Sequence, residues 1–117
     1  MGFECSVLQD NAFGLHDEIG TQRGVSLQCF VDDRMLFAMI IQEAAEDRYG
    51  RRKMTREEAN RLVDGDREAI GALIAEKYRL GEVTRLHPVG GNAYPLILIT
   101  MDDVARRMAP RERRSER

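Results

Sequence analysis

The stretch VSLQCFVDDRMLFAMIIQEAAEDRYG, residues 25–50, decides the fold. Apolar residues fall on every second position of Val25–Val31, which predicts a strand with one buried face. A two-residue hairpin turn is predicted at Asp32-Asp33, because aspartate tolerates the left-handed backbone conformation and bonds its own backbone in turns. Asp-Asp is a weaker hairpin signal than Asp-Gly, so a longer loop or a bulge is the alternative.

The returning strand, Arg34–Ile40, carries apolar residues on both faces. This pattern favours a central strand that is covered on both sides. The next segment, Gln42–Tyr49, is rich in good helix formers and predicts a short helix. Gly50 follows, where a glycine commonly ends a helix.

A second helix is predicted to begin at Thr55, because Thr55 and Glu58 have the spacing of a capping box. The apolar face continues to Leu80, but Asp64-Gly65-Asp66 interrupts it. Glycine is unfavourable inside a helix. This segment therefore predicts either one helix with a weak joint or two nearly collinear helices.

The other elements are read in the same way. We expect a strand at Phe3–Leu8, a loop at Gln9–Arg23, a strand at Glu82–Leu86, turns at His87-Pro88 and Gly90–Asn92, a buried strand at Leu96–Thr100 and a last helix at Met101–Met108.

Together these elements predict an α+β fold. We expect a small antiparallel β-sheet of four to five strands, with the helical segment Thr55–Leu80 packed on one face and a short helix after the central hairpin. Residues 1–108 are expected to form a single compact domain. Residues 109–117 are expected to form a charged, flexible C-terminal tail.

Composition places the chain among soluble globular proteins, with 43% hydrophobic and 32% charged residues among 117. The first ten residues lack the basic and apolar regions of a signal peptide, and no apolar run is long enough to span a bilayer. Cys5 and Cys29 form no paired motif, so we expect two buried, free thiols. These features predict a cytoplasmic protein that does not associate with membranes.

The central stretch resembles a family of small bacterial proteins known as a domain of unknown function (DUF-1488-like). The matching residues are Ile40, Glu43-Ala44, Glu46-Asp47 and Tyr49-Gly50, with looser matches at Asp66-Arg67, Ile70 and Ile99–Asp102. The chain departs from the family at Ile41, where a serine is expected. It also departs at Val83–Tyr94, which is longer than usual, so an added hairpin strand is expected there. The resemblance implies a compact α+β domain of bacterial origin and supplies no activity.

Four patterns in the sequence are candidate chemical sites, and a structural role is favoured for each. They are a metal cluster at His16-Asp17-Glu18 with His87, the carboxylate pairs Asp32-Asp33, Glu46-Asp47, Asp64/Asp66 and Asp102-Asp103, the pair Cys29 and His87, and the glycines Gly90-Gly91. None has the spacing that zinc binding, acid–base catalysis, an activated thiol or a phosphate loop requires. We therefore predict no catalytic, cofactor-binding or metal-binding residues and no small-molecule ligand, and lean towards a non-enzyme.

Basic residues gather between the two helices, at Arg51, Arg52, Lys53 and Arg56 with Arg48 beside them. Six arginines also lie in residues 106–117. Such clusters can neutralise phosphates, so a nucleic-acid-associated accessory protein is one hypothesis. No recognition motif accompanies them, and 6% aromatic residues is too few for an obvious stacking platform.

The favoured hypothesis is a non-enzymatic interaction or regulatory module that self-associates as a homodimer. One helical segment covers one sheet face, so apolar residues on the other face would need a partner subunit. Met35, Phe37 and Met39 are the candidate contact residues. A small enzyme of unknown type is the third hypothesis, and it would require a deep pocket with converging polar groups.

Overall fold

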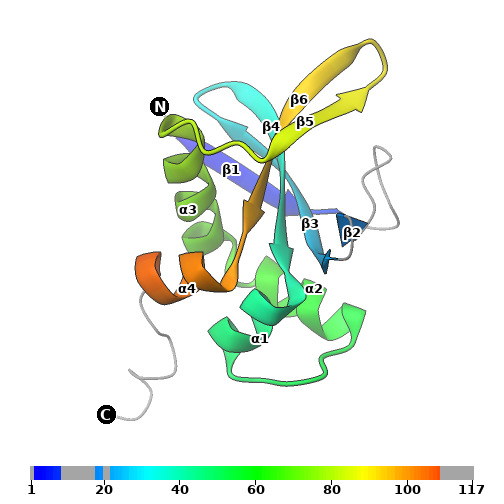
Figure 1. Ribbon diagram of the computed structural model, residues 1–117, viewed down its shortest axis with the longest axis vertical. Coiled ribbons are helices and arrows are strands. Elements are labelled where there is room, and N and C mark those ends of the chain that lie inside the picture. The colour runs from blue at the N-terminus through cyan, green and yellow to red at the C-terminus, as the bar shows by residue number, and fades with distance from the viewer. Residues whose placement is uncertain (1, 9–17, 20–21, 109–117) are drawn as a thin grey trace.

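A computed structural model of the chain describes residues 2–8, 18–19 and 22–108. Its elements are β1 (Phe3–Val7), β2 (Glu18–Ile19), β3 (Gln22–Val31), β4 (Arg34–Ile41), α1 (Gln42–Tyr49), α2 (Arg56–Asp64), α3 (Arg67–Arg79), β5 (Arg85–Val89), β6 (Asn92–Ile99) and α4 (Met101–Arg107) (Figure 1). The expected tail, residues 109–117, lies outside the described residues. Most of the expected loop, Gln9–Arg23, also lies outside the described residues. The part that is described belongs to β2 and to the start of β3.

The sheet has the strand order β1-β3-β4-β6-β5, and β2 pairs with β3. All pairs are antiparallel except β4 with β6, which run parallel from Phe37 opposite Leu96 to Ile40 opposite Ile99. The chain reaches β6 from β4 through α1, α2, α3 and β5. The predicted α+β class is confirmed, and the strand order places β4 at the centre of the sheet, as its apolar pattern indicated. The sheet was expected to be antiparallel, but the β4–β6 pair makes it only mostly antiparallel.

The hairpin between β3 and β4 turns on two residues, which confirms the shorter of the two alternatives. Val31 pairs with Arg34 across the turn, and Asp32 and Asp33 have φ angles of 52° and 67°. Positive φ at both central positions is the requirement of a type I′ turn, whose twist matches that of the flanking strands.

The helical segment is two helices. Thr55 accepts a hydrogen bond from the Glu58 amide while the Glu58 carboxylate accepts one from the Thr55 amide, so the predicted capping box begins α2. Gly65 ends α2, and α3 begins at Arg67. The short helix α1 has the predicted bounds and ends at Gly50 with φ 65°.

One face of the sheet is covered by α2 and α3. Helix α3 contacts β1, β3 and β6, and α2 contacts β1 and β3 (Figure 1). Gly71 lets α3 approach closely, since a Cβ at that position would lie 2.8 Å from the ring of Phe3 and 3.4 Å from the sulfur of Cys5. The main core lies between this sheet face and the helices.

The opposite face carries a smaller cluster centred on Phe37 and Leu96, with Leu8, Met35, Val89 and Tyr94 packed around it. The ring of Phe37 meets the rings of His87 and Tyr94 edge-on, with centroids 5.4 and 5.9 Å apart.

Two predictions about the last third of the chain are wrong. His87-Pro88 was expected to be a turn, but both residues lie within β5, which runs from Arg85 rather than from Glu82. The other turn, predicted at Gly90–Asn92, is confirmed, because Val89 pairs with Asn92 across Gly90-Gly91, and β5 and β6 form the added hairpin expected from the length of this segment. Pro88 is compatible with β5 because an edge strand tolerates a missing amide on its outer side.

Candidate functional site

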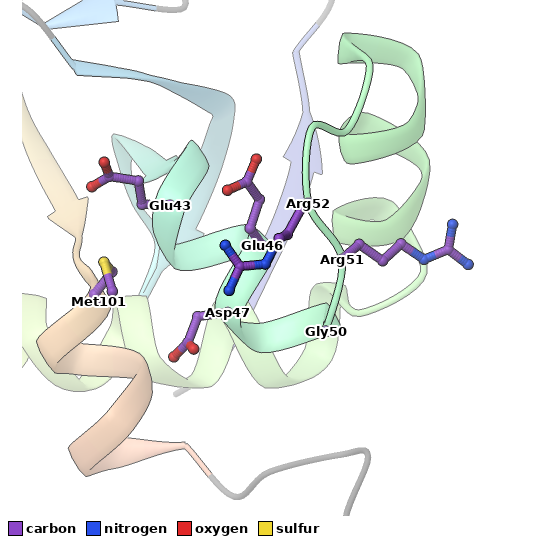
Figure 2. A pocket seen from close by; sticks show the side chains of 7 residues that line it. All are labelled: Glu43, Glu46, Asp47, Gly50, Arg51, Arg52 and Met101. Carbon is purple, nitrogen blue, oxygen red and sulfur yellow. The ribbon is translucent and has the colours of Figure 1, made fainter.

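The predicted basic cluster lies on the connector between α1 and α2. Arg51 and Arg52 line a groove of about 540 Å³ that α1 and the start of α4 complete. The other lining residues are Glu43, Glu46, Asp47, Gly50 and Met101 (Figure 2). Lys53 and Arg56 are exposed beside it.

Carboxylates balance the positive charge of this groove. Arg51 points away from α1 in Figure 2 and pairs with Glu58 at 2.9 Å. Arg52 extends back across α1, towards the acidic side chains of the lining. Glu46 also accepts a hydrogen bond from the Lys53 amide at 3.1 Å. Three carboxylates therefore share the groove with the Arg52 guanidinium, while the Arg51 guanidinium is paired with Glu58, and this mixture is a poor match for a polyanion.

Arg48 does not belong to the exposed basic cluster, although the sequence placed it there. Its side chain is buried and binds Asp66 through two hydrogen bonds, Nε to Oδ2 at 2.8 Å and Nη2 to Oδ1 at 3.2 Å. The Tyr49 hydroxyl donates to the same carboxylate at 2.9 Å. Burial, reinforced by the charge of Asp66, raises the pKa of the Tyr49 phenol, so it stays protonated as a donor. This network ties the end of α1 to the start of α3.

Two of the three proposed contact residues on β4 lie inside the protein. Phe37 and Met39 are fully buried, and Met35 is half-buried. The premise that these side chains need a partner subunit to cover them is therefore wrong for Phe37 and Met39, because the single chain already encloses them.

Exposed apolar side chains occur instead where α3 leads into β5. Leu80 is 62% exposed, Val83 37% and Leu86 60%. On the β5–β6 hairpin, Leu86 is paired with Pro95 and Pro88 with Ala93. Because side chains alternate along a strand, these four residues share the sheet face that includes Ile97. We call Leu80, Val83, Leu86, Pro88, Ala93 and Pro95 the ribbon strip.

The ribbon strip continues the helix-covered face of the sheet beyond the reach of the helices. Helix α3 ends at Arg79, and the β5–β6 hairpin projects away from the helices (Figure 1). Sequence reasoning missed this surface because it treated Leu86 as the end of a strand. The surface could have been found from the pairing of Leu86 with Pro95 in a hairpin. That pairing can be predicted only if the hairpin turn is placed at Gly90-Gly91.

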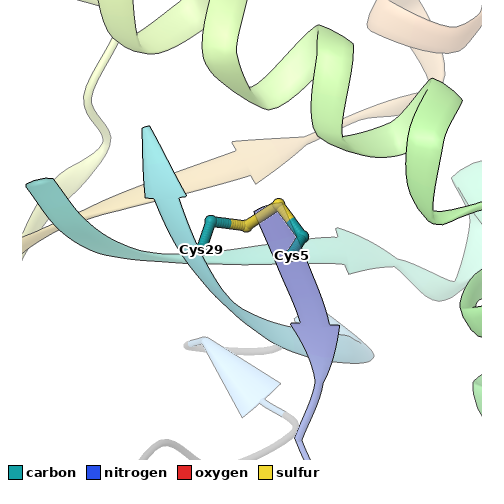
Figure 3. Close-up of a disulfide and its surroundings, with 2 residues drawn as sticks. All are labelled: Cys5 and Cys29. Atoms are coloured by element: carbon teal, nitrogen blue, oxygen red, sulfur yellow. A yellow bond between two sulfur atoms is a disulfide. The ribbon is translucent and has the colours of Figure 1, made fainter. Parts of the chain in front are cut away.

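The two cysteines are a further correction. They form a disulfide between β1 and β3, so neither is a free thiol (Figure 3). Their strands pair with Cys5 directly opposite Cys29. Cys5 also lines a groove of about 410 Å³ between β1 and the junction of α2 with α3.

The remaining chemical candidates gain no support. His16 and Asp17 lie outside the described residues. Cys29 is held in the disulfide and has no thiolate to pair with His87. Gly90 and Gly91 form the hairpin turn at the end of the ribbon.

Within the described ranges, no group of three or more histidine, cysteine, aspartate or glutamate side chains is placed to hold a metal ion. None of the helices described is long and apolar enough to cross a membrane. Comparison with models of protein families, with curated proteins and with solved structures found no match. The resemblance to the domain of unknown function therefore stays a prediction.

Proposed function

We propose that this chain is a non-enzymatic interaction module that self-associates through the ribbon strip. The observation that carries the proposal is the exposure of Leu86, about three-fifths accessible, on the hairpin face that continues the covered sheet face, together with the equally exposed Leu80 at the end of α3. Contiguous exposed apolar surface is typical of interaction sites, whereas single exposed apolar residues are not.

A second copy of the chain is the occupant that the chemistry of the strip favours. A two-fold interface packs the same surface patch of one copy on that of the other, so residues near the axis meet their own counterparts. Like charges would then meet and repel, but the residues of the ribbon strip are all uncharged. Strand addition at the edge of β5 is less favourable, because Pro88 has no amide to donate. Packing of one ribbon face on another is the arrangement we propose.

The experiment is a measurement of mass by light scattering at tens of micromolar protein. The wild-type chain is expected to have the mass of two copies, and Leu86→Lys is expected to be a monomer. Met101→Lys is the matched control, because Met101 is also an exposed apolar residue but lies on α4, at the groove of the basic connector. A wild-type chain that is strictly monomeric, or a loss of association in Met101→Lys alone, would overturn the proposal.

The nucleic-acid hypothesis receives less support from the charges around Arg51 and Arg52. Polyanion binding scales with the number of phosphates that are neutralised, and each cation here has acidic neighbours. A titration against duplex and single-stranded DNA and RNA at low salt tests this alternative. Tight binding that disappears when Arg51, Arg52 and Lys53 are replaced by alanine would favour it over self-association.

A further inference from the structure

We infer that the Cys5–Cys29 disulfide can be reduced in the folded protein, by attack on Cys5 from the adjoining groove, and that its reduction loosens the packing of α3 on β1. The bond would then act as a redox-controlled switch for this edge of the fold. The inference does not depend on the proposed self-association.

The disulfide joins an edge strand to the interior of the sheet. The strand order places β1 at the end of the sheet, next to β3. Cys5 faces Cys29 directly in the antiparallel register, with their Cα atoms 4.1 Å apart. An edge strand has a neighbour on one side only, so a covalent bond to that neighbour adds to the single ladder of five residue pairs that holds β1 in the sheet.

The two cysteine residues differ in their exposure to solvent. Cys5 is 5% exposed and lines the groove together with Glu4, Asp64 and Arg67. Cys29 is fully buried in the core. A small thiol can therefore approach Cys5 from the groove, whereas Cys29 is enclosed. Access is one of the factors that decide which sulfur of a disulfide is attacked.

The exchange requires a dithiol as reductant. One thiolate of the dithiol attacks Cys5 Sγ, and Cys29 Sγ leaves as a thiolate and takes up a proton. The second thiolate of the reagent then attacks the reagent sulfur that is bonded to Cys5 in the mixed disulfide. This step releases Cys5 as a thiolate, which is also protonated. Two electrons pass from the dithiol to the protein, two cysteine thiols form, and the reagent becomes a cyclic disulfide.

Reduction changes the space that the sulfur atoms need. Two sulfurs that are no longer bonded must move apart. Because Cys29 is enclosed, Cys5 makes most of that movement. On the α3 side the packing is already tight, since a Cβ at Gly71 would lie 3.4 Å from Cys5 Sγ and 2.8 Å from the ring of Phe3. Displacement of Cys5, which lies in β1, therefore loosens the packing of β1 against α3 at Gly71.

The first test is the kinetics of reduction by dithiothreitol under native conditions. If the bond is attacked in the folded protein, the rate rises in proportion to the dithiothreitol concentration. A rate that is independent of the reagent and equal to the rate of global unfolding would overturn the inference. This measurement uses the wild-type chain and needs no variant to fold.

The second test separates the two sulfurs and follows the helix. The single thiol of Cys29→Ser is expected to react with a small alkylating reagent at least about tenfold faster than the single thiol of Cys5→Ser. Hydrogen exchange in α3 and β1 is expected to be faster in the reduced wild-type chain than in the oxidised chain, whereas exchange in α1 stays the same. Equal labelling of the two variants, or equal exchange of α3 in both redox states, would contradict the account.

Discussion

Lys77 Nζ lies 2.5 Å from Asp103 Oδ2 and 2.7 Å from the carbonyl oxygen of Leu98, in a site where both charged side chains are about nine-tenths buried. Asp103 also accepts hydrogen bonds from the amide of Thr100 at 3.0 Å, as part of the capping box that begins α4. One ammonium group thus joins the last turn of α3 to the end of β6 and the start of α4.

Lys77→Met is expected to lower the free energy of unfolding by about 3 kcal/mol, because it leaves the Asp103 carboxylate buried without its counter-charge. Urea unfolding measures the change. Arg106→Ala is the control, since it removes the exposed pair of Arg106 with Asp102 and is expected to cost less than about 0.5 kcal/mol. Equal losses in the two variants would show that the buried pair contributes no more than a surface pair.

The same pair predicts a dependence of stability on pH. Burial by itself raises the pKa of the Asp103 carboxyl, but hydrogen bonds from Lys77 and Thr100 outweigh it and hold the pKa below its ordinary value. The ionised carboxylate therefore stabilises the fold above about pH 4, the range of an aspartate in an unfolded chain, and this contribution is lost as the pH falls through the lower folded-state pKa.

Unfolding of the wild-type chain and of Asp103→Asn at pH 7 and pH 3 tests this dependence. The stability difference between them is expected to shrink at the lower pH. A difference that stays the same at both pH values would mean that Asp103 does not carry the effect.

Glycine at position 71 is expected to be required for the packing of α3 on β1. Gly71→Ala gains helix propensity, but its methyl group would overlap the ring of Phe3, so a net loss of about 1 kcal/mol is expected. Gly65→Ala is the matched control, because the nearest atom to its Cβ would be 3.6 Å away and its φ is −73°. It is expected to raise the melting temperature, and a similar rise in Gly71→Ala would contradict the close packing.

The turn between β3 and β4 predicts a stabilising substitution. Asp33 has φ 67°, a conformation that glycine adopts without the steric cost of a Cβ. Asp33→Gly is expected to raise the free energy of unfolding by about 0.5–1 kcal/mol. Asp33→Ala keeps the Cβ and is expected to be destabilising, so thermal unfolding of the two variants isolates the backbone effect. A lower melting temperature for Asp33→Gly would argue against the type I′ turn.

Asp32 is unsuitable for the same substitution, although its φ is also positive. Its carboxylate binds Arg79 through two hydrogen bonds of 2.7 and 3.0 Å, which fasten the turn to the end of α3. The hydrogen bond and charge of Arg79 lower the pKa of Asp32, which shows that the ionised form is favoured in the folded protein.

Features that depend on neighbours in sequence could be predicted. The bounds of α1, the capping box at Thr55 and the two-residue turn at Asp32 follow from local rules for capping and turns. The central position of β4 also followed from its apolar pattern, because a strand that is apolar on both faces must be covered on both sides.

Features that depend on pairing between distant segments could not be predicted. The cysteines bond because β1 and β3 align in a register that places Cys5 opposite Cys29, and nothing in either strand alone fixes that register. The burial of Arg48 depends on Asp66, which lies 18 residues away in the sequence. The ribbon strip likewise depends on α3 ending before it covers the β5–β6 hairpin.

Photo-crosslinking from position 86 tests self-association through the ribbon strip most directly. With Leu86 replaced by p-benzoylphenylalanine, irradiation of the pure protein is expected to yield a covalent species of twice the chain mass, whose peptides join position 86 to the β5–β6 hairpin of the second copy. The same reagent in place of Met101 is expected to yield none. Irradiation that leaves only single chains at tens of micromolar protein, or that gives equal crosslinking from both positions, would contradict the account.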